Sequence, residues 1–240
     1  VEQLSKSFGQ LQAVNNVSFE AQDGRITGLL GPNGVGKSTT FRILYTVFEP
    51  GVGSVLIDGI NISKDPLEAR QHIGVLPHDA GLYQNLTAKE NISYYGQLYG
   101  LSKKQIEARV NELIELLDIG EFANQRAKGF SQGQRIKVAL ARALIHKPQN
   151  VILDEPTNGL DVMSTRALRE YIKRLRDDGT CVLFSSHIMQ EIAALCDDII
   201  ILNHGNVVVS GTPDKIRKHT GNENLEDAFV SILGDEEGME

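Results

Sequence analysis

The sequence predicts an α/β fold with a mainly parallel β-sheet, and three observations lead to this prediction. An apolar run at residues 26–30 enters a glycine-rich loop and continues as a helical stretch at 39–48. From residue 151 onward, short apolar strands alternate with helical segments. Between these regions, residues 87–147 have a helical pattern. Alternating strands and helices are typical of a parallel sheet covered by helices, with the central helical stretch as an insertion.

The segment before the insertion contains mostly strands. Alternating residues predict strands at 17–21 and 54–57, each followed by an Asp-Gly turn. A further strand is expected at 72–76, where Pro77 stops it.

Two capping patterns and an apolar periodicity define the helical stretch. Thr87 and Glu90 have the spacing of a capping box, and Ser102 and Gly120 are expected to begin and end a second helix. The apolar residues of that second helix recur at helical spacing, namely Ile106, Val110, Leu113, Ile114 and Leu117. Residues 87–147 are therefore expected to pack as a helical subdomain.

Beyond the insertion, strands return. Strands are predicted at 151–153 and 180–185, helices at 163–177 and 187–195, and a closing hairpin at 198–210 around Gly205-Asn206. The fully apolar run at 151–153 is typical of a buried parallel strand.

Composition narrows the class of protein. The chain has 31 acidic and 24 basic residues and a net charge of −7, which disfavours nucleic acid as the main ligand. The two cysteines, Cys181 and Cys196, lie in apolar surroundings and predict small buried residues rather than a disulfide. No apolar run approaches the roughly 18 residues of a membrane span. We therefore expect a soluble, cytoplasmic protein.

The glycine-rich loop at 31–39 matches the phosphate-binding pattern G-x-x-x-x-G-K-[ST]. In this pattern the glycines turn backbone N–H groups toward phosphate oxygens, and the following helix N-terminus adds its positive dipole end. Lys37 then reaches the β- and γ-phosphates, and the Ser38 hydroxyl ligates Mg²⁺. A glycine-rich surface turn would not require Lys-Ser-Thr to follow. The sequence predicts a P-loop NTPase, with nucleotide contacts from Asn33, Gly34, Gly36, Lys37, Ser38 and Thr39.

Two adjacent carboxylates end the apolar strand at 151–153. A carboxylate at the end of a buried strand beside a phosphate loop is the usual second Mg²⁺ anchor in this class of ATPase, which gives Asp154 that role. Glu155 points elsewhere and is a candidate general base that polarises the attacking water. Without the phosphate loop, a strand that simply ends in two acids would explain the pair equally well.

The segment Phe130-Ser131-Gln132-Gly133-Gln134 identifies a family, because it resembles the signature motif of ABC ATPases. Ser131 is a natural N-cap, and the free N–H groups of the helix that follows can receive an anion. The resemblance covers nearly the whole chain and implies that Ser131, Gly133 and Gln134 contact the γ-phosphate of a nucleotide held by a second subunit. It also implies ATP as the nucleotide.

The resemblance implies one ABC-type domain over residues 1–240. Its nucleotide-binding core would comprise residues 1–86 and 148–240 and include an N-terminal antiparallel β-subdomain, and its helical signature subdomain would comprise residues 87–147.

Further roles follow from the same resemblance. The segment Asn158-Gly159-Leu160-Asp161 looks like the loop that passes between two subunits, so Asp161 is a candidate nucleotide contact. His187 resembles the switch histidine that contacts the γ-phosphate and orients the catalytic carboxylate, which makes Lys37, Glu155 and His187 the candidate catalytic set. Phe8 matches the aromatic residue that stacks on adenine, with Val14 nearby.

Two positions depart from the family pattern. His78 stands where the family has a glutamine that offers an oxygen to Mg²⁺, and imidazole is a poor ligand for that ion. We therefore hypothesise that His78 reaches the metal shell only through water, or that Asp79 compensates. Gln132 stands where glycine is usual, which alters the fit to the opposite phosphate.

The resemblance implies an ATPase subunit of an ABC transporter that dimerises on ATP and drives a separately encoded permease from the inner face of the cell membrane. Residues 79–87, with Tyr83, Tyr94, Tyr95 and Tyr99, would receive that permease, although each tyrosine could equally pack the helical subdomain. The motifs at 74–101 and the tail at 224–229 look most like exporters of the ABC-2 type, with sodium-extrusion subunits most similar.

The alternative is a cytosolic ABC ATPase without a membrane partner, acting in assembly or regulation. A switch GTPase is excluded because the sequence has no guanine motif of the N-K-x-D kind.

Overall fold

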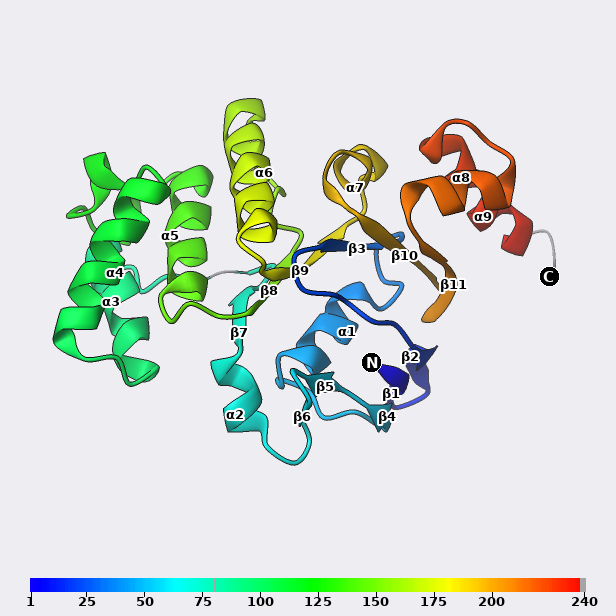
Figure 1. Cartoon of the computed structure of the whole chain (residues 1–240), viewed down its shortest axis with the longest axis horizontal. Coiled ribbons are helices and arrows are strands. Elements are labelled where there is room, and N and C mark those ends of the chain that lie inside the picture. Colours follow the sequence, from blue (N-terminus) through cyan, green and yellow to red (C-terminus); the bar gives the residue numbers. More distant parts are fainter. Residues whose placement is uncertain (80, 238–240) are drawn as a thin grey trace.

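The computed structural model describes residues 1–79 and 81–237, and side chains up to residue 234. A six-stranded sheet in the order β11-β10-β3-β9-β8-β7 forms its centre (Figure 1). All neighbouring pairs in this sheet are parallel except β10 and β11, which form the closing hairpin. The strands are β3 (Ile26–Leu30), β7 (Ile73–Leu76), β8 (Asn150–Asp154), β9 (Cys181–Ser186), β10 (Asp198–Asn203) and β11 (Asn206–Gly211). The predicted mainly parallel α/β sheet is confirmed.

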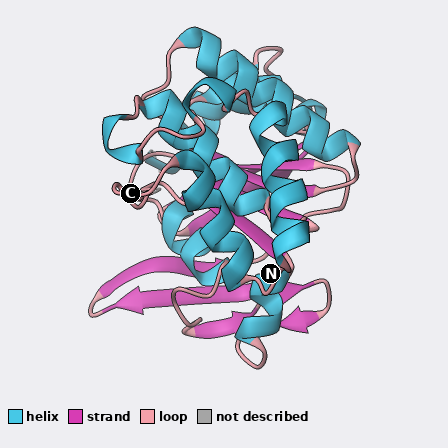
Figure 2. Cartoon of the chain, turned by 90° about the vertical axis from the view of Figure 1, so that its left-hand side faces the viewer, coloured by secondary structure: helices cyan, strands magenta, loops and turns pink. Residues whose placement is uncertain are grey.

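A smaller antiparallel sheet lies at the N-terminus. It has the order β2-β1-β4 and comprises β1 (Glu2–Phe8), β2 (Leu11–Val17) and β4 (Val52–Ser54). A two-stranded hairpin of β5 (Leu56–Ile57) and β6 (Ile60–Asn61) follows. In Figure 2 the antiparallel strands form a layer below the helices.

Helices cover both faces of the central sheet. They are α1 (Lys37–Leu44), α2 (Pro66–Gln71), α3 (Ala88–Leu98), α4 (Lys103–Leu116), α5 (Gln132–Leu144), α6 (Val162–Asp177), α7 (Met189–Leu195), α8 (Pro213–Thr220) and α9 (Leu225–Glu237). Helices α3, α4 and α5 gather at one end of the molecule, and α6 and α7 lie on the opposite side of the sheet from α1 (Figure 1). In the described part of the chain, no helix is both long and apolar enough to cross a membrane.

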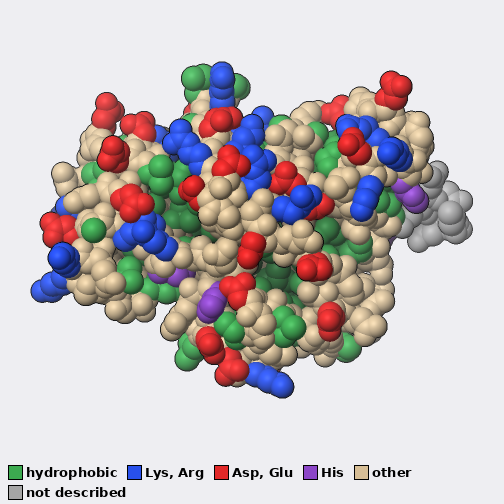
Figure 3. Space-filling model, viewed as in Figure 1, with side chains coloured by type: hydrophobic (Ala, Val, Ile, Leu, Met, Phe, Trp, Pro, Cys, Tyr) green, Lys and Arg blue, Asp and Glu red, His purple; other side chains and the backbone are tan. Residues whose placement is uncertain are grey.

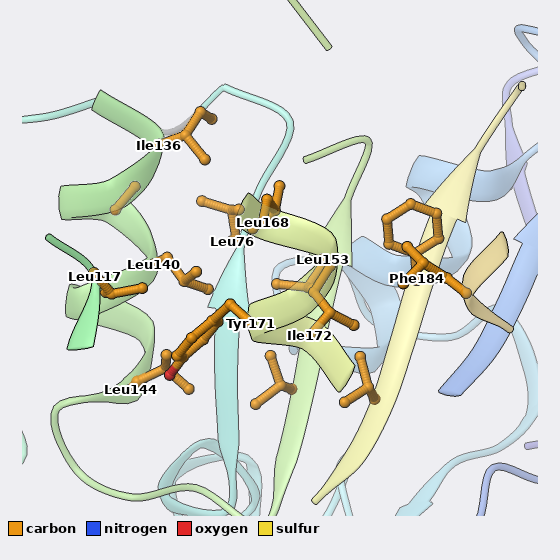
Figure 4. Packing of buried hydrophobic residues seen from close by; sticks show 14 of the residues in the cluster. Leu76, Leu117, Ile136, Leu140, Leu144, Leu153, Leu168, Tyr171, Ile172 and Phe184 are labelled. Carbon is orange, nitrogen blue, oxygen red and sulfur yellow. The ribbon is translucent and has the colours of Figure 1, made fainter. Parts of the chain in front are cut away.

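Each face of the sheet buries its own core. Ile152 and Leu183 pack in a cluster with Phe41 of α1, whereas the next residues along the same strands, Leu153 and Phe184, belong to the other cluster, which also contains residues of α5 and α6 (Figure 4). This alternation follows from the two-residue period of a strand. Because both faces are covered, all residues of β3 and β8 are buried, as expected for parallel strands.

Both cysteines also lie in the buried interior. They are free thiols, as predicted, and burial raises the pKa of Cys181 to about 12.

Capping explains where the helices of the central stretch begin. Thr87 and Glu90 form the predicted capping box at α3, and Ser102 caps α4. The predicted end of α4 at Gly120 is wrong, because the helix ends at Leu116 and Asp118 takes the left-handed conformation with φ 52°. The reversal turns Ile119, which is fully buried, into the core, and Lys137 of α5 donates to the Asp118 carbonyl.

Three strand and turn boundaries differ from the predicted ones. The strand expected at 17–21 is wrong beyond Val17, where β2 ends; past this point in the described chain, only Phe19 exchanges backbone hydrogen bonds with Val1, at 3.1 and 2.9 Å. The strand expected at 54–57 is interrupted at the buried Val55. The turn of the closing hairpin is His204-Gly205, both with positive φ, rather than Gly205-Asn206.

Close packing of β7 against α5 generates a stability prediction. A Cβ atom at Gly74 would lie 2.3 Å from the Ala143 carbonyl oxygen and 2.7 Å from Pro148 Cγ. Backbone cannot yield easily, so Gly74→Ala should lower the free energy of unfolding by about 1–3 kcal/mol. Urea denaturation measures this change. The matched control is Gly120→Ala, where an added Cβ meets nothing within 4 Å, and equal stability of the two variants would contradict the prediction.

Candidate functional site

Four chain segments meet at one edge of the central sheet. Strands β3, β9, β8 and β7 are parallel neighbours, so their carboxyl ends share this edge. In open α/β sheets this edge is where ligands bind. Here an open hollow of about 460 Å³ is lined by Asn33, Ser38, His78, Glu155, Asn158 and His187.

The loop after β3 has the backbone conformation of a phosphate cradle. Gly34 and Gly36 have φ of 86° and 104°, in the left-handed region that favours glycine. A Cβ atom at Gly36 would also lie 2.2 Å from the Ala13 carbonyl oxygen of β2, so that position requires glycine for packing as well. Gly36 is the N-cap of α1 and supplies no side-chain cap, which leaves first-turn N–H groups of α1 for an anion.

Lys37 is held inside the site. Its side chain is only 4% exposed, and its Nζ donates to the carbonyl oxygens of Gly31 at 2.7 Å and Pro32 at 3.0 Å. Nζ also lies 3.6 Å from Glu155 Oε1. Burial lowers the pKa of Lys37, and the neighbouring carboxylates of Glu155 and Asp154 oppose that shift. The ammonium group therefore sits among oxygen acceptors at the mouth of the glycine loop.

Asp154 and Ser38 form an oxygen-rich pair below the loop. Asp154 is 1% exposed, and its Oδ1 accepts from Ser38 Oγ at 3.2 Å and from Ser185 Oγ at 2.7 Å. Its other oxygen, Oδ2, is buried without a hydrogen-bond partner among the described residues. A buried carboxylate oxygen without a partner is costly unless a cation or donor reaches it. Hydroxyl and carboxylate oxygens are also the ligands that Mg²⁺ prefers, so these residues fit that ion.

Glu155 is the meeting point of three basic side chains. Its Oε2 lies 3.3 Å from His187 Nδ1 and 3.9 Å from His78 Nδ1, while Oε1 faces Lys37. Its backbone has φ 49°, a strained value for a residue with a side chain. The N–H of Glu155 donates to Ser185 Oγ at 2.9 Å, which stabilises this turn. The conformation directs the carboxylate into the hollow while Asp154 remains buried beneath it.

The signature segment lies elsewhere. Ser131 is the N-cap of α5, as predicted, in a reciprocal capping box with Gln134. In residues 1–79 and 81–237, Ser131, Gly133 and Gln134 are not among the side chains lining the hollow. Instead, this end of α5 adjoins the start of α6, since a Cβ atom on Gly133 would lie 3.2 Å from Ser164 Oγ.

Asp161 caps α6. Its carboxylate accepts from the backbone N–H of Ser164 at 2.9 Å and from the Ser164 hydroxyl at 2.7 Å. These hydrogen bonds lower the pKa of Asp161. The side chain thus has a local structural role within this chain, and its contact with a nucleotide stays a prediction.

The remaining predicted contacts differ in accessibility. Phe8 is 42% exposed, packs edge-on against Phe48 with ring centroids 5.3 Å apart, and has Lys6 Nζ over its ring at 5.6 Å from the centroid. Val14 is fully buried in the core next to Gly36, where its role is packing. Thr39 lies on α1 and is partly exposed. The parts predicted for these three residues in nucleotide binding stay predictions.

Comparison with known proteins decides the family. The family model described as "ABC transporter" matches residues 14–158. The ABC transporter ATP-binding protein NatA of Bacillus subtilis is 42% identical over 224 residues, covering 93% of this chain and 91% of that protein. The Nod factor export ATP-binding protein I of Rhizobium meliloti is 36% identical, covering 89% of this chain and 64% of that protein.

The chain belongs to the ABC transporter family.

Solved structures agree with this assignment. The structure of an ATP-binding subunit of an ABC transporter superposes with a TM-score of 0.89 at 30% identity, covering 97% of this chain and 98% of that one. A dimeric ATP-binding cassette in a post-hydrolysis state, bound to ADP and Pi, superposes with a TM-score of 0.80 at 27% identity, covering 88% of this chain and 97% of that one. The family predicted from the signature segment is confirmed, and the protein is an ABC ATPase that binds ATP.

The sequence of this ABC ATPase did not predict a role for two residues at the site. Ser185 links both carboxylate residues, and Glu191 accepts hydrogen bonds from Thr157 and Ser186. Serines at a strand end and a glutamate in a short helix are common, so neither stands out locally. The only available signal is the Ser-Ser pair directly before His187, where β9 reaches the edge of the sheet that holds the phosphate loop.

The bridging position of Ser185 generates a prediction. Ser185→Ala removes the acceptor for the Glu155 N–H and one donor to Asp154, both in a buried setting. An unpaired buried polar group costs about 1–3 kcal/mol, so the free energy of unfolding should fall by that amount. ATPase activity should fall as well, because Glu155 loses its backbone restraint. The control is Ser210→Ala, an exposed position on β11. A Ser185→Ala protein with unchanged urea midpoint and turnover would refute the bridging role.

Proposed function

We propose that this ABC ATPase powers a separately encoded membrane permease, an exporter of the ABC-2 type, through ATP-driven dimerisation. The observation that carries the proposal is the hollow at the sheet edge, where the Glu155 carboxylate faces Lys37 and His187 while Ser131 lies outside it. One chain thus presents the phosphate side of a nucleotide site, and its signature segment is free to act on a second copy.

The loop residues hold the triphosphate in this proposal. Asn33 and the glycine backbone at 34–36 receive the phosphates, and Thr39 extends the contact along α1. Lys37 leaves its carbonyl acceptors and binds the β- and γ-phosphate oxygens. Ser38 and Asp154 would hold Mg²⁺, which would supply positive charge to the phosphates.

Glu155 is proposed as the general base and His187 as the residue that orients it. The carboxylate is 11% exposed, at the surface of the hollow rather than sealed beneath it, so it can accept a proton from a water beside the γ-phosphate. The 3.3 Å approach of His187 Nδ1 supports the orienting role. Lys37 and His187 would also place positive or hydrogen-bonding groups near the transferred phosphate.

Dimerisation would bring Ser131, Gly133, Gln134 and Asp161 to the partner's nucleotide. Two exposed apolar residues support an interface at this end of α6, because Val162 and Met163 are 83% and 72% exposed directly after Asp161. The dimeric form of the related cassette bound to ADP and Pi supports it as well. At the other end of the nucleotide, Phe8 would stack on adenine, with Val14 supporting the loop from beneath.

A permease surface is proposed around residues 81–95. Tyr83 and Tyr94 are 48% and 37% exposed and contact each other edge-on, at a centroid distance of 5.3 Å. Arg142 of α5 donates to the Gly81 carbonyl at 2.7 Å and lies 3.9 Å from the centre of the Tyr95 ring, which stabilises the loop. Exposed tyrosines on a firm support are typical of interface cores. Through this contact the subunit would lie on the inner face of the cell membrane.

Export is supported by the name of the Nod factor export relative, whereas sodium as the cargo rests only on the resemblance of the sequence motifs. The second candidate, a cytosolic ABC ATPase without a membrane partner, differs in what it binds. Co-purification of a multi-span membrane protein, lost when Tyr83 and Tyr94 are both changed to Ala, would support the transporter subunit. A chain that purifies alone from membranes and cytosol would favour the second candidate.

The composite site gives a prediction about Glu155. Glu155→Gln should lower turnover by about 10²–10⁴-fold, because the amide cannot act as base. ATP binding should persist, so the variant should double in mass with ATP and Mg²⁺ in light scattering. The added substitution Ser131→Arg should abolish the doubling. A variant that stays monomeric at saturating ATP would argue that dimerisation needs the permease, and full turnover in Glu155→Gln would remove the assigned base.

His78 gives a separate prediction. The imidazole is 46% exposed and lies beside Glu155 Oε2, on the rim of the hollow that also contains Ser38. Under the hypothesis that His78 meets the Mg²⁺ shell only through water, His78→Gln supplies a direct oxygen and should lower the Mg²⁺ concentration for half-maximal turnover. The control is His204→Gln, an exposed turn position on the closing hairpin. Unchanged turnover and Mg²⁺ dependence in His78→Gln would refute the hypothesis.

A further inference from the structure

We infer that Glu191 is a positioning residue that sets the distance between Glu155 and His187. It lies on α7, outside the hollow, and touches neither of these side chains directly in any described contact. The inference rests on the proposed function, because it concerns how the assigned base and its orienting histidine are held.

The carboxylate of Glu191 joins two loops. Its Oε2 accepts a hydrogen bond from Thr157 Oγ1 at 2.7 Å and a second from Ser186 Oγ at 2.7 Å. All three residues are buried, with exposures of 5% for Glu191, 8% for Thr157 and 2% for Ser186. Short hydrogen bonds to a charged acceptor are roughly twice as strong as neutral ones, so one oxygen atom fixes both loops.

The two bound residues flank the catalytic candidates. Thr157 follows Glu155 by two positions, on the segment that continues to Asn158. Ser186 directly precedes His187, and its Oγ also accepts from the Ile188 N–H at 3.0 Å, so the backbone on both sides of the histidine is held. A shift of either loop would change the 3.3 Å separation of Glu155 Oε2 and His187 Nδ1.

A second hollow of about 240 Å³ separates the loops, and Glu155, Asn158, His187 and Glu191 all contribute to its wall. At the wall of this hollow, the Glu191 carboxylate joins the loop that contains Thr157 to the loop that contains Ser186. On the other side of Glu191, Oε1 faces Arg169 of α6 at 3.8 Å, which compensates its charge in a buried setting.

A buried carboxylate lowers the stability of the fold through its desolvation penalty, which suggests that the geometry of the two loops that it joins matters for function. Burying an ionised group costs several kcal/mol in general, and an apolar residue of similar volume often stabilises equally well. The strand bodies of β8 and β9 are already paired up to Asp154 and Ser185. Glu191 therefore restrains the part of the chain that lies beyond the sheet, where the functional side chains project.

The test compares Glu191→Ala with Glu191→Gln. Because Glu191 Oε2 alone accepts the hydrogen bonds from both hydroxyl groups, the amide oxygen of a glutamine at this position can keep both of them. A displacement of about 1 Å can cost up to 10²-fold, so Glu191→Ala should lower kcat at least about 10-fold, with KM for ATP changed less than about 3-fold. Glu191→Gln should stay within about 3-fold of the parent protein. The matched control is Glu170→Ala on α6, whose carboxylate is 61% exposed and should have no effect.

A spectroscopic readout separates positioning from simple loss of stability. The imidazole resonances of His187, assigned by their absence in His187→Ala, should move in Glu191→Ala and stay in place in Glu191→Gln and Glu170→Ala. If Glu191→Ala does not fold, the pair Thr157→Val and Ser186→Ala removes both donors and should reproduce the loss of kcat and the shifted resonances.

The outcomes distinguish the two levels of inference. Unmoved His187 resonances with unchanged kcat in Glu191→Ala, or in the Thr157→Val and Ser186→Ala pair, would overturn the positioning role, as would equal losses in Glu191→Ala and Glu191→Gln. Full turnover in both Glu155→Gln and His187→Ala would instead overturn the proposed function. In that case the His187 resonances still report whether Glu191 holds the histidine.

Discussion

Parallel pairing of β3, β9 and β8 is the constraint on which the whole site depends. Leu30 pairs with Ser186, and Asp154 pairs with Ser185, so the three strands end level with one another. The phosphate loop, the two acidic residues and His187 are far apart in sequence, and this register alone brings them to one edge. Because both faces of the sheet are buried, a slip of one strand by one residue would move its side chains into the core of the opposite face, where they would disrupt close packing, which protects the register.

The same edge concentrates charges that would be costly elsewhere. Lys37 and Asp154 are almost fully buried, and Glu155 is nearly so. Each is compensated by a specific neighbour: backbone carbonyls for Lys37, hydroxyl groups for Asp154, and basic side chains for Glu155. One atom, Asp154 Oδ2, remains without a described partner. Among the described residues, the site therefore holds an unpaired buried carboxylate oxygen next to the phosphate loop, where a cation and a polyanion could bind together.

Charge on the surface follows a different pattern from charge in the site. Although the chain has a net charge of −7, basic side chains gather on α6, while acidic side chains are spread over the visible face (Figure 3). The half-buried Arg169 of α6 faces Glu191, so the same helix that displays basic residues outward also compensates a carboxylate near the site. Helix α6 begins with the Asp161 cap and the exposed Val162, and so links the Glu191 contact to the surface proposed for dimerisation.

The sequence by itself determined those features whose physics is local. The phosphate loop, Asp154-Glu155, the caps at Thr87, Ser102 and Ser131, and the alternation that gives a parallel sheet all depend on residues within about one helical turn or one strand of each other, and the confirmed family follows from the same motifs. Only the tertiary structure decided the end of α4 at Asp118, the end of β2 at Val17, and the bridges made by Ser185 and Glu191. Each of these depends on a partner 15 to 34 residues away in the chain, as in the contacts of Gln3 with Ser18, Lys137 with Asp118, Ser185 with Asp154, and Thr157 with Glu191. Such contacts form only when segments that are separate in the sequence pack together, and so no local pattern of residues encodes them.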